Sequence, residues 1–109
     1  MTTDALTIER HGSVMVLHLD DGKANALSFD LIAAVRAAIA EAEGDEAIGA
    51  VVIHGREGRF SGGFDLGVMY GGDLPKILGL VADGGDLVRT LWGCGVPVVA
   101  ACTGHAVAA

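Results

Sequence analysis

The sequence predicts an α/β fold with a largely parallel sheet, on three observations. Two short, mostly apolar segments flank a Gly-Ser turn near the start of the chain, which is typical of a β-hairpin. Two segments with apolar residues at helical spacing follow, and each precedes a short apolar run. Those two runs lack polar alternation, which favours strands of a parallel sheet. The predicted order is ββαβαβ, and helical crossovers between parallel strands are almost always right-handed.

The first two strands are expected over Ala5–Glu9 and Val14–Asp20. Apolar and polar residues alternate in the first strand, whereas the second is apolar on both faces apart from His18. Gly12 and Ser13 supply the turn between them. The chain therefore begins with an antiparallel hairpin.

A helix is expected from the N-cap Ser28 to Gly44, with Asp30 favourably placed in its first turn. Its apolar residues recur at helical spacing. The third strand is expected over Ile48–His54, and because it has no polar alternation we expect it to be buried on both faces. The apolar helix positions are Leu31, Ile32, Val35, Ala38, Ile39 and Ala42.

A polar and glycine-rich loop follows the third strand, and Asp65–Tyr70 then favours a single helical turn. Leu74–Trp92 is expected to form a helix, although three internal glycines weaken it. The fourth strand is expected over Val96–Cys102. No repeat, linker or low-complexity tract interrupts this order.

Two loops should meet at one edge of this sheet. In open parallel sheets, ligands bind beyond the carboxyl ends of the strands. The loop Arg56–Leu66 follows the third strand, and the segment Thr103–Ala109 follows the fourth. The sequence therefore directs two loops rich in glycine and alanine towards the same place.

The length of 109 residues fits one domain or part of one. The chain is 51% hydrophobic and only 19% charged, which is more apolar than an isolated domain usually is. Surplus apolar surface usually meets another surface, so we expect an oligomer or a fragment. The apolar end of the chain favours the fragment, and residues 1–109 are expected to be the amino-terminal portion of a single domain.

Several functional classes are disfavoured. The net charge is −7, and the seven Lys and Arg residues do not cluster, which argues against binding to nucleic acid or to an anionic membrane surface. The sequence has neither a signal peptide nor a long apolar span. Cys94 and Cys102 are expected to be buried free thiols of a cytoplasmic protein. No metal site is expected, and His11, His18 and His54 are interpreted as ordinary strand or turn residues.

The stretch RFSGGFDL, Arg59–Leu66, admits several chemical interpretations. A P-loop would need a Lys and a hydroxyl at fixed offsets, and a dinucleotide loop would need GxGxxG; neither is present. A nucleophile elbow would need Gly where Arg59 stands, which disfavours a triad of Ser61, His105 and Asp65. Two interpretations stay open: backbone N–H donors directed at a ligand oxygen, and a glycine turn that serves packing alone.

Taken together, three segments resemble the amino-terminal part of the enoyl-CoA hydratase/isomerase (crotonase) superfamily. They are Asn25-Ala26-Leu27, the loop Phe60–Leu66, and Pro97–Gly104, and they match that family in order and spacing. Each motif is weak alone, whereas the three together are fairly specific. The resemblance covers essentially the whole chain.

The resemblance implies a spiral of ββα units, acyl-CoA thioester ligands without a cofactor, and trimers that often pair into hexamers. It places two backbone N–H donors, which form an oxyanion hole, on Phe64 and Ala109. Asp65 belongs to this loop motif, and we expect it to cap or brace the turn rather than to transfer protons. His105 could line the site, but packing is its favoured role. The implied substrate-binding residues are Lys23, Ala24, Ala26, Gly62, Gly63, Asp65, Leu66 and Gly67.

This sequence departs from the family pattern in three ways. Gly67 stands where many members carry a Lys that helps to hold CoA phosphate, and Ala109 stands where Gly is usual. The catalytic carboxylates of hydratases and isomerases correspond to positions beyond residue 109. We therefore expect enoyl-CoA hydration or double-bond isomerisation from the complete protein, and no turnover from these 109 residues alone. The alternatives are a non-catalytic acyl-CoA-binding protein and a serine hydrolase that uses Ser61.

Overall fold

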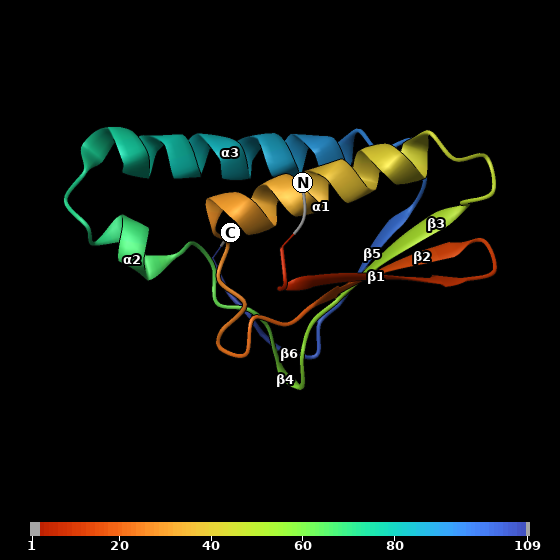
Figure 1. Ribbon diagram of the computed structural model, residues 1–109, viewed down its shortest axis with the longest axis horizontal. Helices are drawn as coiled ribbons and strands as arrows, with labels where there is room; N and C mark the ends of the chain where they lie inside the picture. Colours follow the sequence, from red (N-terminus) through yellow and green to blue (C-terminus); the bar gives the residue numbers. More distant parts are fainter. Residues whose placement is uncertain (1–2, 109) are drawn as a thin grey trace.

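The computed structural model describes residues 3–108 and arranges them in two sheets and three helices (Figure 1). The larger sheet has the strand order β1-β2-β3-β5 and the smaller one pairs β4 with β6. The strands are β1 (Leu6–His11), β2 (Val14–Leu19), β3 (Ala50–His54), β4 (Gly58–Ser61), β5 (Val98–Ala101) and β6 (Gly104–Ala106). The helices are α1 (Phe29–Glu43), α2 (Leu66–Met69) and α3 (Leu74–Trp92).

Strand directions in the larger sheet follow the prediction. β1 and β2 form the antiparallel hairpin, and Gly12 in their turn has a φ of +62°, a conformation that glycine adopts without strain. β2 pairs in parallel with β3, and β3 pairs in parallel with β5. The α/β class and the largely parallel sheet are therefore confirmed.

The two long helices start and end where the sequence predicts. The Oγ of Ser28 accepts a hydrogen bond from the N–H of Leu31 at 3.1 Å and caps α1, and Gly44 ends that helix. A carboxylate oxygen of Asp73 accepts from the N–H of Lys76 at 3.2 Å and caps α3. Both caps satisfy backbone donors that have no partner within their helix.

The core lies between the helices and one face of the larger sheet. α1 and α3 pack against each other and both lie on the same side of that sheet (Figure 1). The burial of apolar side chains between these layers is the main force that holds them together. The largest fully buried side chains are those of Met15, Leu17, Leu31, Ile32, Ile39, Val51, Leu80 and Asn25.

The expectation that the third strand is buried on both faces is wrong for the described residues. Val51 and Ile53 of β3 are buried, whereas Val52 between them is only half-buried. In β5 the side chain of Val99 is exposed. Among residues 3–108 the helices cover only one face of the sheet, so alternate residues of these apolar strands remain accessible.

Both parallel strands are shorter than predicted. β3 begins at Ala50 because the N–H of Ile48 turns back to the carbonyl of Asp45, at 3.0 Å. β5 begins at Val98, after Pro97, which has no N–H to donate to the sheet. β4 and β6 lie inside segments that the sequence predicts as loops, because strands of four and three residues leave little periodicity to detect.

His18 and His54 are neighbours across the β2–β3 pair, as ordinary strand residues. Their rings stack with centroids 4.8 Å apart, and their Nδ1 atoms are 2.8 Å apart, so one ring donates a hydrogen bond and the other accepts it. Within residues 3–108, no group of three or more His, Cys, Asp or Glu residues is arranged to hold a metal ion. Cys94 and Cys102 are free thiols, but Cys102 is exposed rather than buried because it follows the edge strand.

Candidate functional site

The candidate site lies where the three parallel strands end. β2, β3 and β5 run in the same direction, so the segments that follow them emerge at one edge of the sheet. The two loops predicted to meet there do so, as the paired strands β4 and β6. Beyond this pairing, the N–H of Val107 donates to the carbonyl of Ser61 at 3.1 Å.

Gly63 allows a close approach between these two segments. Its φ is +90°, and a Cβ placed on it would lie 2.7 Å from the Cβ of Ala108. Any larger residue would clash with Ala108, which itself has a left-handed φ of +60°. Ala109, the residue expected to carry the second backbone donor, lies outside the described residues.

The loop Gly62–Asp65 contains one backbone donor that has no acceptor among residues 3–108. The N–H groups of Gly62, Gly63 and Asp65 donate to oxygens of the protein at 2.8, 3.1 and 3.1 Å. The N–H of Phe64 has no acceptor within the described part of the chain, residues 3–108. Because its neighbours are held at both sides, the loop fixes the orientation of this free N–H group in advance.

The buried side chain of Asn25 holds this loop in place. The sequence did not point to Asn25 as a site residue. Its side chain is 1% exposed. Its Nδ2 donates to the carbonyls of Leu19 and Phe60 at 2.9 and 3.2 Å, and its Oδ1 accepts from the N–H of Asp21 at 2.9 Å. Its backbone has a φ of +53°, which Asn tolerates better than most residues. Asn25 therefore joins the end of β2 to the start of the loop.

Ser61 is a structural residue in this arrangement. It is nearly buried, its Oγ donates to the carbonyl of Asn25 at 2.9 Å, and the same Oγ accepts from the N–H of Gly63 at 3.1 Å. Among residues 3–108, no hydrogen bond joins Ser61 to His105 or Asp65. A serine nucleophile needs a base within hydrogen-bond reach, so this geometry disfavours the hydrolase alternative.

Asp65 caps α2, as predicted. A carboxylate oxygen of Asp65 accepts from the N–H of Val68 at 3.3 Å, at the start of this short helix. His105 lies in β6 opposite Arg59, with its side chain exposed. The prediction that His105 serves packing is therefore wrong for the described residues, because β6 is covered on neither side there.

The loop of residues 20–26 forms the other side of the site. Asp21 folds it into a tight turn, since its carboxylate accepts from the N–H groups of Lys23, Asn25 and Ala26 at 2.7, 3.0 and 3.3 Å. Burial alone would raise the pKa of Asp21, but these hydrogen bonds and the positive charge of Arg56 lower it below its usual value. The Asp21 side chain therefore remains charged and holds the turn.

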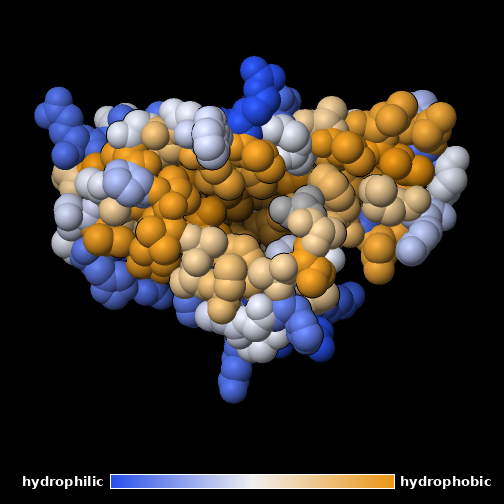
Figure 2. Space-filling model, turned by 180° about the vertical axis from the view of Figure 1, so that it is seen from behind, coloured by the Kyte–Doolittle hydropathy of each residue, from blue (hydrophilic) through white to orange (hydrophobic). Residues whose placement is uncertain are grey.

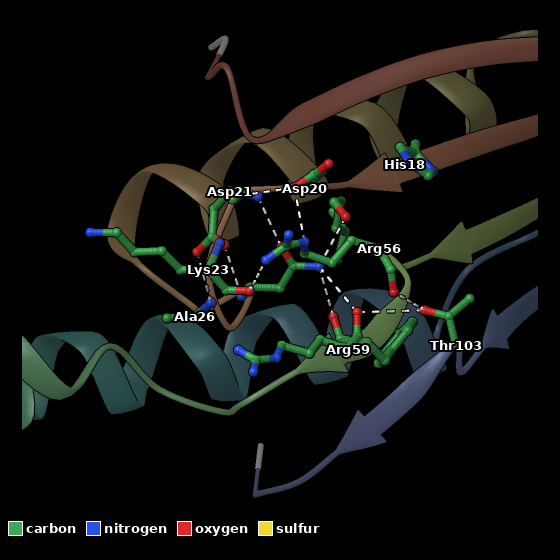
Figure 3. Close-up of polar contacts among 12 residues, drawn as sticks. His18, Asp20, Asp21, Lys23, Ala26, Arg56, Arg59 and Thr103 are labelled. Atoms are coloured by element: carbon green, nitrogen blue, oxygen red, sulfur yellow. Dashed lines mark hydrogen bonds and ion pairs between the residues drawn. The ribbon is translucent and has the colours of Figure 1, made fainter.

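Arg56, just past β3, ties this loop to the sheet. Its guanidinium pairs with the carboxylate of Asp20 at 3.3 Å and donates to the carbonyl of Lys23. Its own carbonyl accepts from the Oγ1 of Thr103 at 2.6 Å, so it also contacts the segment after β5. Figure 3 shows Arg56 between these partners, with the ammonium end of Lys23 directed away from them.

A groove of about 540 Å³ collects almost all the predicted binding residues, and we call it the loop groove. Within residues 3–108, Lys23 is the only cation that lines it, and the lining also includes Asp21, Asp30 and Asp65. Gly63 is the one predicted binding residue that does not line it, since it faces Ala108 instead. The predicted residues that do line it are Lys23, Ala24, Ala26, Gly62, Phe64, Asp65, Leu66 and Gly67.

A second cavity of about 390 Å³ lies between α3 and the sheet, and we call it the apolar cavity. Its lining residues are almost all apolar, and Figure 2 shows a hollow surrounded by apolar side chains on this side of the molecule. Leu27, Ser61 and Gly84 form its boundary towards the loop groove. Trp92, 92% exposed, lies at its other end.

Comparisons with known proteins agree with this architecture. The family model described as enoyl-CoA hydratase/isomerase matches residues 9–109. The chain is 34% identical over 108 residues to the probable enoyl-CoA hydratase EchA14 of Mycobacterium tuberculosis; the match covers 95% of this chain and 40% of that protein. The chain thus spans less than half the length of this relative.

Two solved structures of one Mycobacterium tuberculosis protein share the fold, and they describe that protein in different terms. The probable enoyl-CoA hydratase EchA3 is 41% identical with a TM-score of 0.90, over 96% of this chain and 44% of that one. An apo structure described as an enoyl-CoA isomerase is 40% identical with a TM-score of 0.88, over 96% of this chain and 45% of the other. The crotonase-like fold is therefore confirmed, for a chain that spans under half of these structures.

None of the helices within residues 3–108 is sufficiently long and apolar to span a lipid bilayer. The family match covers nearly the whole chain, and the folds agree closely over the same residues. This chain therefore belongs to the enoyl-CoA hydratase/isomerase family.

Proposed function

We propose that this chain is the amino-terminal portion of a single crotonase-like domain, and that the complete protein acts on an acyl-CoA thioester through an enolate. The observation that carries the proposal is the free N–H of Phe64, held in the wall of the loop groove while its neighbours' N–H groups are all engaged. We place the thioester oxygen at this N–H, with the N–H of Ala109 as the second donor.

The donor at Phe64 supports catalysis because charge builds up on the oxygen that it contacts. The thioester oxygen becomes an enolate in the transition state, so a fixed N–H donor stabilises the transition state more than the substrate. Removing one donor of this kind typically raises the barrier by about 2.7–4 kcal/mol. Because the donor is a backbone group, Phe can occupy this position without loss of the hydrogen bond.

The loop groove is our candidate binding site for the CoA portion of the thioester substrate. Lys23 is its only lining cation, beside three carboxylates, and Gly67 adds no charge. Two of those carboxylates are engaged within the protein, Asp21 by three N–H groups and Asp65 as the cap of α2. We therefore infer that contacts to the backbone and shape hold CoA here more than charge does, with Lys23 as the one phosphate partner.

Hydration needs two acidic groups around a water molecule, whereas isomerisation can proceed with one base. One relative is described both as a probable enoyl-CoA hydratase and as an enoyl-CoA isomerase, so the proposal covers enoyl-CoA hydration and enoyl-CoA isomerisation. Asp21 and Asp65 are held in structural hydrogen bonds, and we assign neither a proton-transfer role. We expect residues 1–109 alone to have no turnover.

A second candidate, a non-catalytic acyl-CoA-binding protein, is favoured by the same engaged carboxylates. The two are separated by assaying the complete protein and the 109-residue chain with crotonyl-CoA and a 3-enoyl-CoA, and by measuring acyl-CoA binding. Turnover by the complete protein supports the enzyme, and binding without turnover supports the binding protein. Turnover by residues 1–109 alone would contradict the assignment of the acid and base to other residues.

The Ser61 hydrolase makes a separate prediction. If Ser61 only supports the loop, the complete protein will not be labelled at Ser61 by a fluorophosphonate, because its Oγ is engaged by Asn25 and Gly63. Ser61→Ala should lower stability by about 1 kcal/mol through the lost hydrogen bonds. Stoichiometric labelling of Ser61 would instead support the serine hydrolase alternative.

We further propose that the complete protein works without a cofactor, in the cytoplasm, as a homotrimer or a pair of trimers. The support is the family to which the chain belongs and the apolar surface of α3, where Leu74, Leu78 and Trp92 are exposed. Sedimentation of the complete protein tests the assembly, and a monomer at micromolar concentration would contradict it.

A further inference from the structure

The loop groove and the apolar cavity lie on opposite sides of one thin wall. Gly62 and Phe64 line the groove, whereas Ser61, the last residue of β4, lines the cavity. Leu27 lines the cavity, although the residues on either side of it line the groove. A parallel bridge closes this part of the wall, with the N–H of Leu27 donating to Gly63 at 2.8 Å.

The remainder of the wall is the ring of Phe64, which lies against Gly84 of α3. A Cβ placed on Gly84 would be 2.5 and 2.6 Å from Cε1 and Cζ of that ring, so only glycine fits. Glycine in a helix interior is unfavourable by about 1 kcal/mol relative to alanine. At the adjacent Gly85 nothing lies within 4 Å of a Cβ, so the close fit is specific to Gly84.

We propose that Phe64 is a specificity-determining residue, and that its ring limits the length of the acyl chain that the protein can bind. The inference rests on the proposed function, which places the thioester oxygen at the N–H of the same residue. An acyl chain attached there starts on the groove side of the wall. The ring on Gly84 closes the passage to the apolar cavity, whose volume of about 390 Å³ is sufficient for a small apolar ligand.

With the ring in place, the protein accepts short acyl groups. Removing the ring joins the two spaces and opens an apolar cavity to the end of a longer chain. Each methylene group that becomes buried should strengthen binding roughly fourfold, which is the equivalent of about 0.8 kcal/mol. Four to six additional carbons should therefore produce a large change in chain-length preference.

The test compares butyryl-CoA with decanoyl-CoA, by calorimetry, on the complete wild-type protein and on Phe64→Ala. We expect the ratio of the two dissociation constants to shift at least tenfold towards decanoyl-CoA in the variant. Phe60→Ala is the matched control, because Phe60 lines the apolar cavity but not the loop groove. Phe64→Leu, which removes less of the ring and preserves more packing, should shift the ratio in the same direction.

An unchanged ratio in both Phe64 variants, or an equal shift in Phe60→Ala, would overturn the chain-length proposal and leave the proposed function intact. If the wild-type protein binds neither thioester, the proposed function fails and this inference fails with it. If Phe64→Ala does not fold, the ratio for Phe64→Leu decides.

Discussion

Asn25 shows how a single buried side chain shapes the whole site. Its amide reaches the end of β2, the turn at Asp21 and the start of the loop at Phe60. Its bonds to Leu19 and Phe60 lie in buried or half-buried surroundings, where a polar group without a partner is costly. A short amide that both donates and accepts is needed here, and Asn also tolerates the left-handed backbone.

We expect Asn25→Ala to lower the free energy of unfolding by about 1–3 kcal/mol per backbone group left without a partner. Urea denaturation of the 109-residue chain or of the complete protein measures this loss. Asn25→Gly is the matched control, because it removes the same hydrogen bonds but relieves the left-handed backbone. Asn25→Ala should therefore be the less stable of the two, and equal stability would show that the backbone conformation contributes nothing.

At this scale the sequence indicates some roles and hides others. The cap at Asp65 and the tight approach at Gly63 follow from local rules, because both depend on neighbours in the sequence or on the freedom of glycine. The contacts of Asn25 with Phe60 and of Gly84 with Phe64 join residues 35 and 20 positions apart. Periodicity and motif spacing contain no signal for such contacts.

The contact between the loop and α3 is the central feature at the scale of elements. Helix propensity alone makes Gly84 unfavourable in α3, but the absence of a Cβ at this position leaves room for the Phe64 ring. The ring fixes the distance between the loop with the free N–H and the longest helix. The position of the proposed donor is therefore set by packing between elements as well as by hydrogen bonds within the loop.

Two neighbouring glycines allow a direct test of this contact. We expect Gly84→Ala to destabilise the fold by about 1–3 kcal/mol, since the new Cβ overlaps the ring. Gly85→Ala meets open space and should be neutral, or stabilising by up to about 1 kcal/mol from helix propensity. Combining Gly84→Ala with Phe64→Leu should recover part of the loss. Equal effects of the two alanine variants on urea denaturation would refute the contact.

The 20–26 loop should be sensitive to acid. The pKa of Asp21 is lowered in the folded state, so protons bind more readily to the unfolded state as the pH falls. The stabilisation from Asp21 is complete above the usual carboxyl pKa of about 4 and is lost as the pH drops through the lowered value. The loop should therefore loosen below about pH 4.

The variant Asp21→Asn tests whether the stabilisation from Asp21 is lost as the pH falls. The variant should be less stable than the wild type at pH 7, and the difference should diminish as the pH is lowered from 5 to 3, because the wild type loses its charged acceptor there. Urea denaturation at a series of pH values measures the difference. A difference that stays constant, or that widens in acid, would contradict the role given to the Asp21 carboxylate.

The elements were predictable where their signal is local. The hairpin, the two long helices, the caps of α1 at Ser28 and Gly44, and the two parallel strands follow from periodicity, capping residues and the absence of polar alternation. β4 and β6 do not, since their pairing joins segments about 46 residues apart through runs of only four and three residues. The sequence nevertheless predicts that these two segments meet, because parallel strands end at the same edge.

At the scale of the whole molecule, the described residues form one helix-covered sheet with the site at its edge. One face of the larger sheet and part of α3 keep apolar side chains exposed, with Val99, Leu74 and Trp92 among them. The apolar composition of the sequence therefore has a physical counterpart on two surfaces. The chain spans 40% of the relative EchA14, and this is consistent with our proposal that it is one portion of a larger domain.

The central claim is that the N–H of Phe64 donates a hydrogen bond to the thioester oxygen. The most direct test is to replace Phe64 in the complete protein by phenyllactic acid, which exchanges this N–H for an oxygen and keeps the ring. Replacing Gly62 by glycolic acid is the control, since the N–H of Gly62 is used internally, by the carbonyl of Ala24. We predict that kcat for crotonyl-CoA falls about 10²–10³-fold for Phe64 and much less for Gly62. Wild-type kcat with the Phe64 ester would contradict the account.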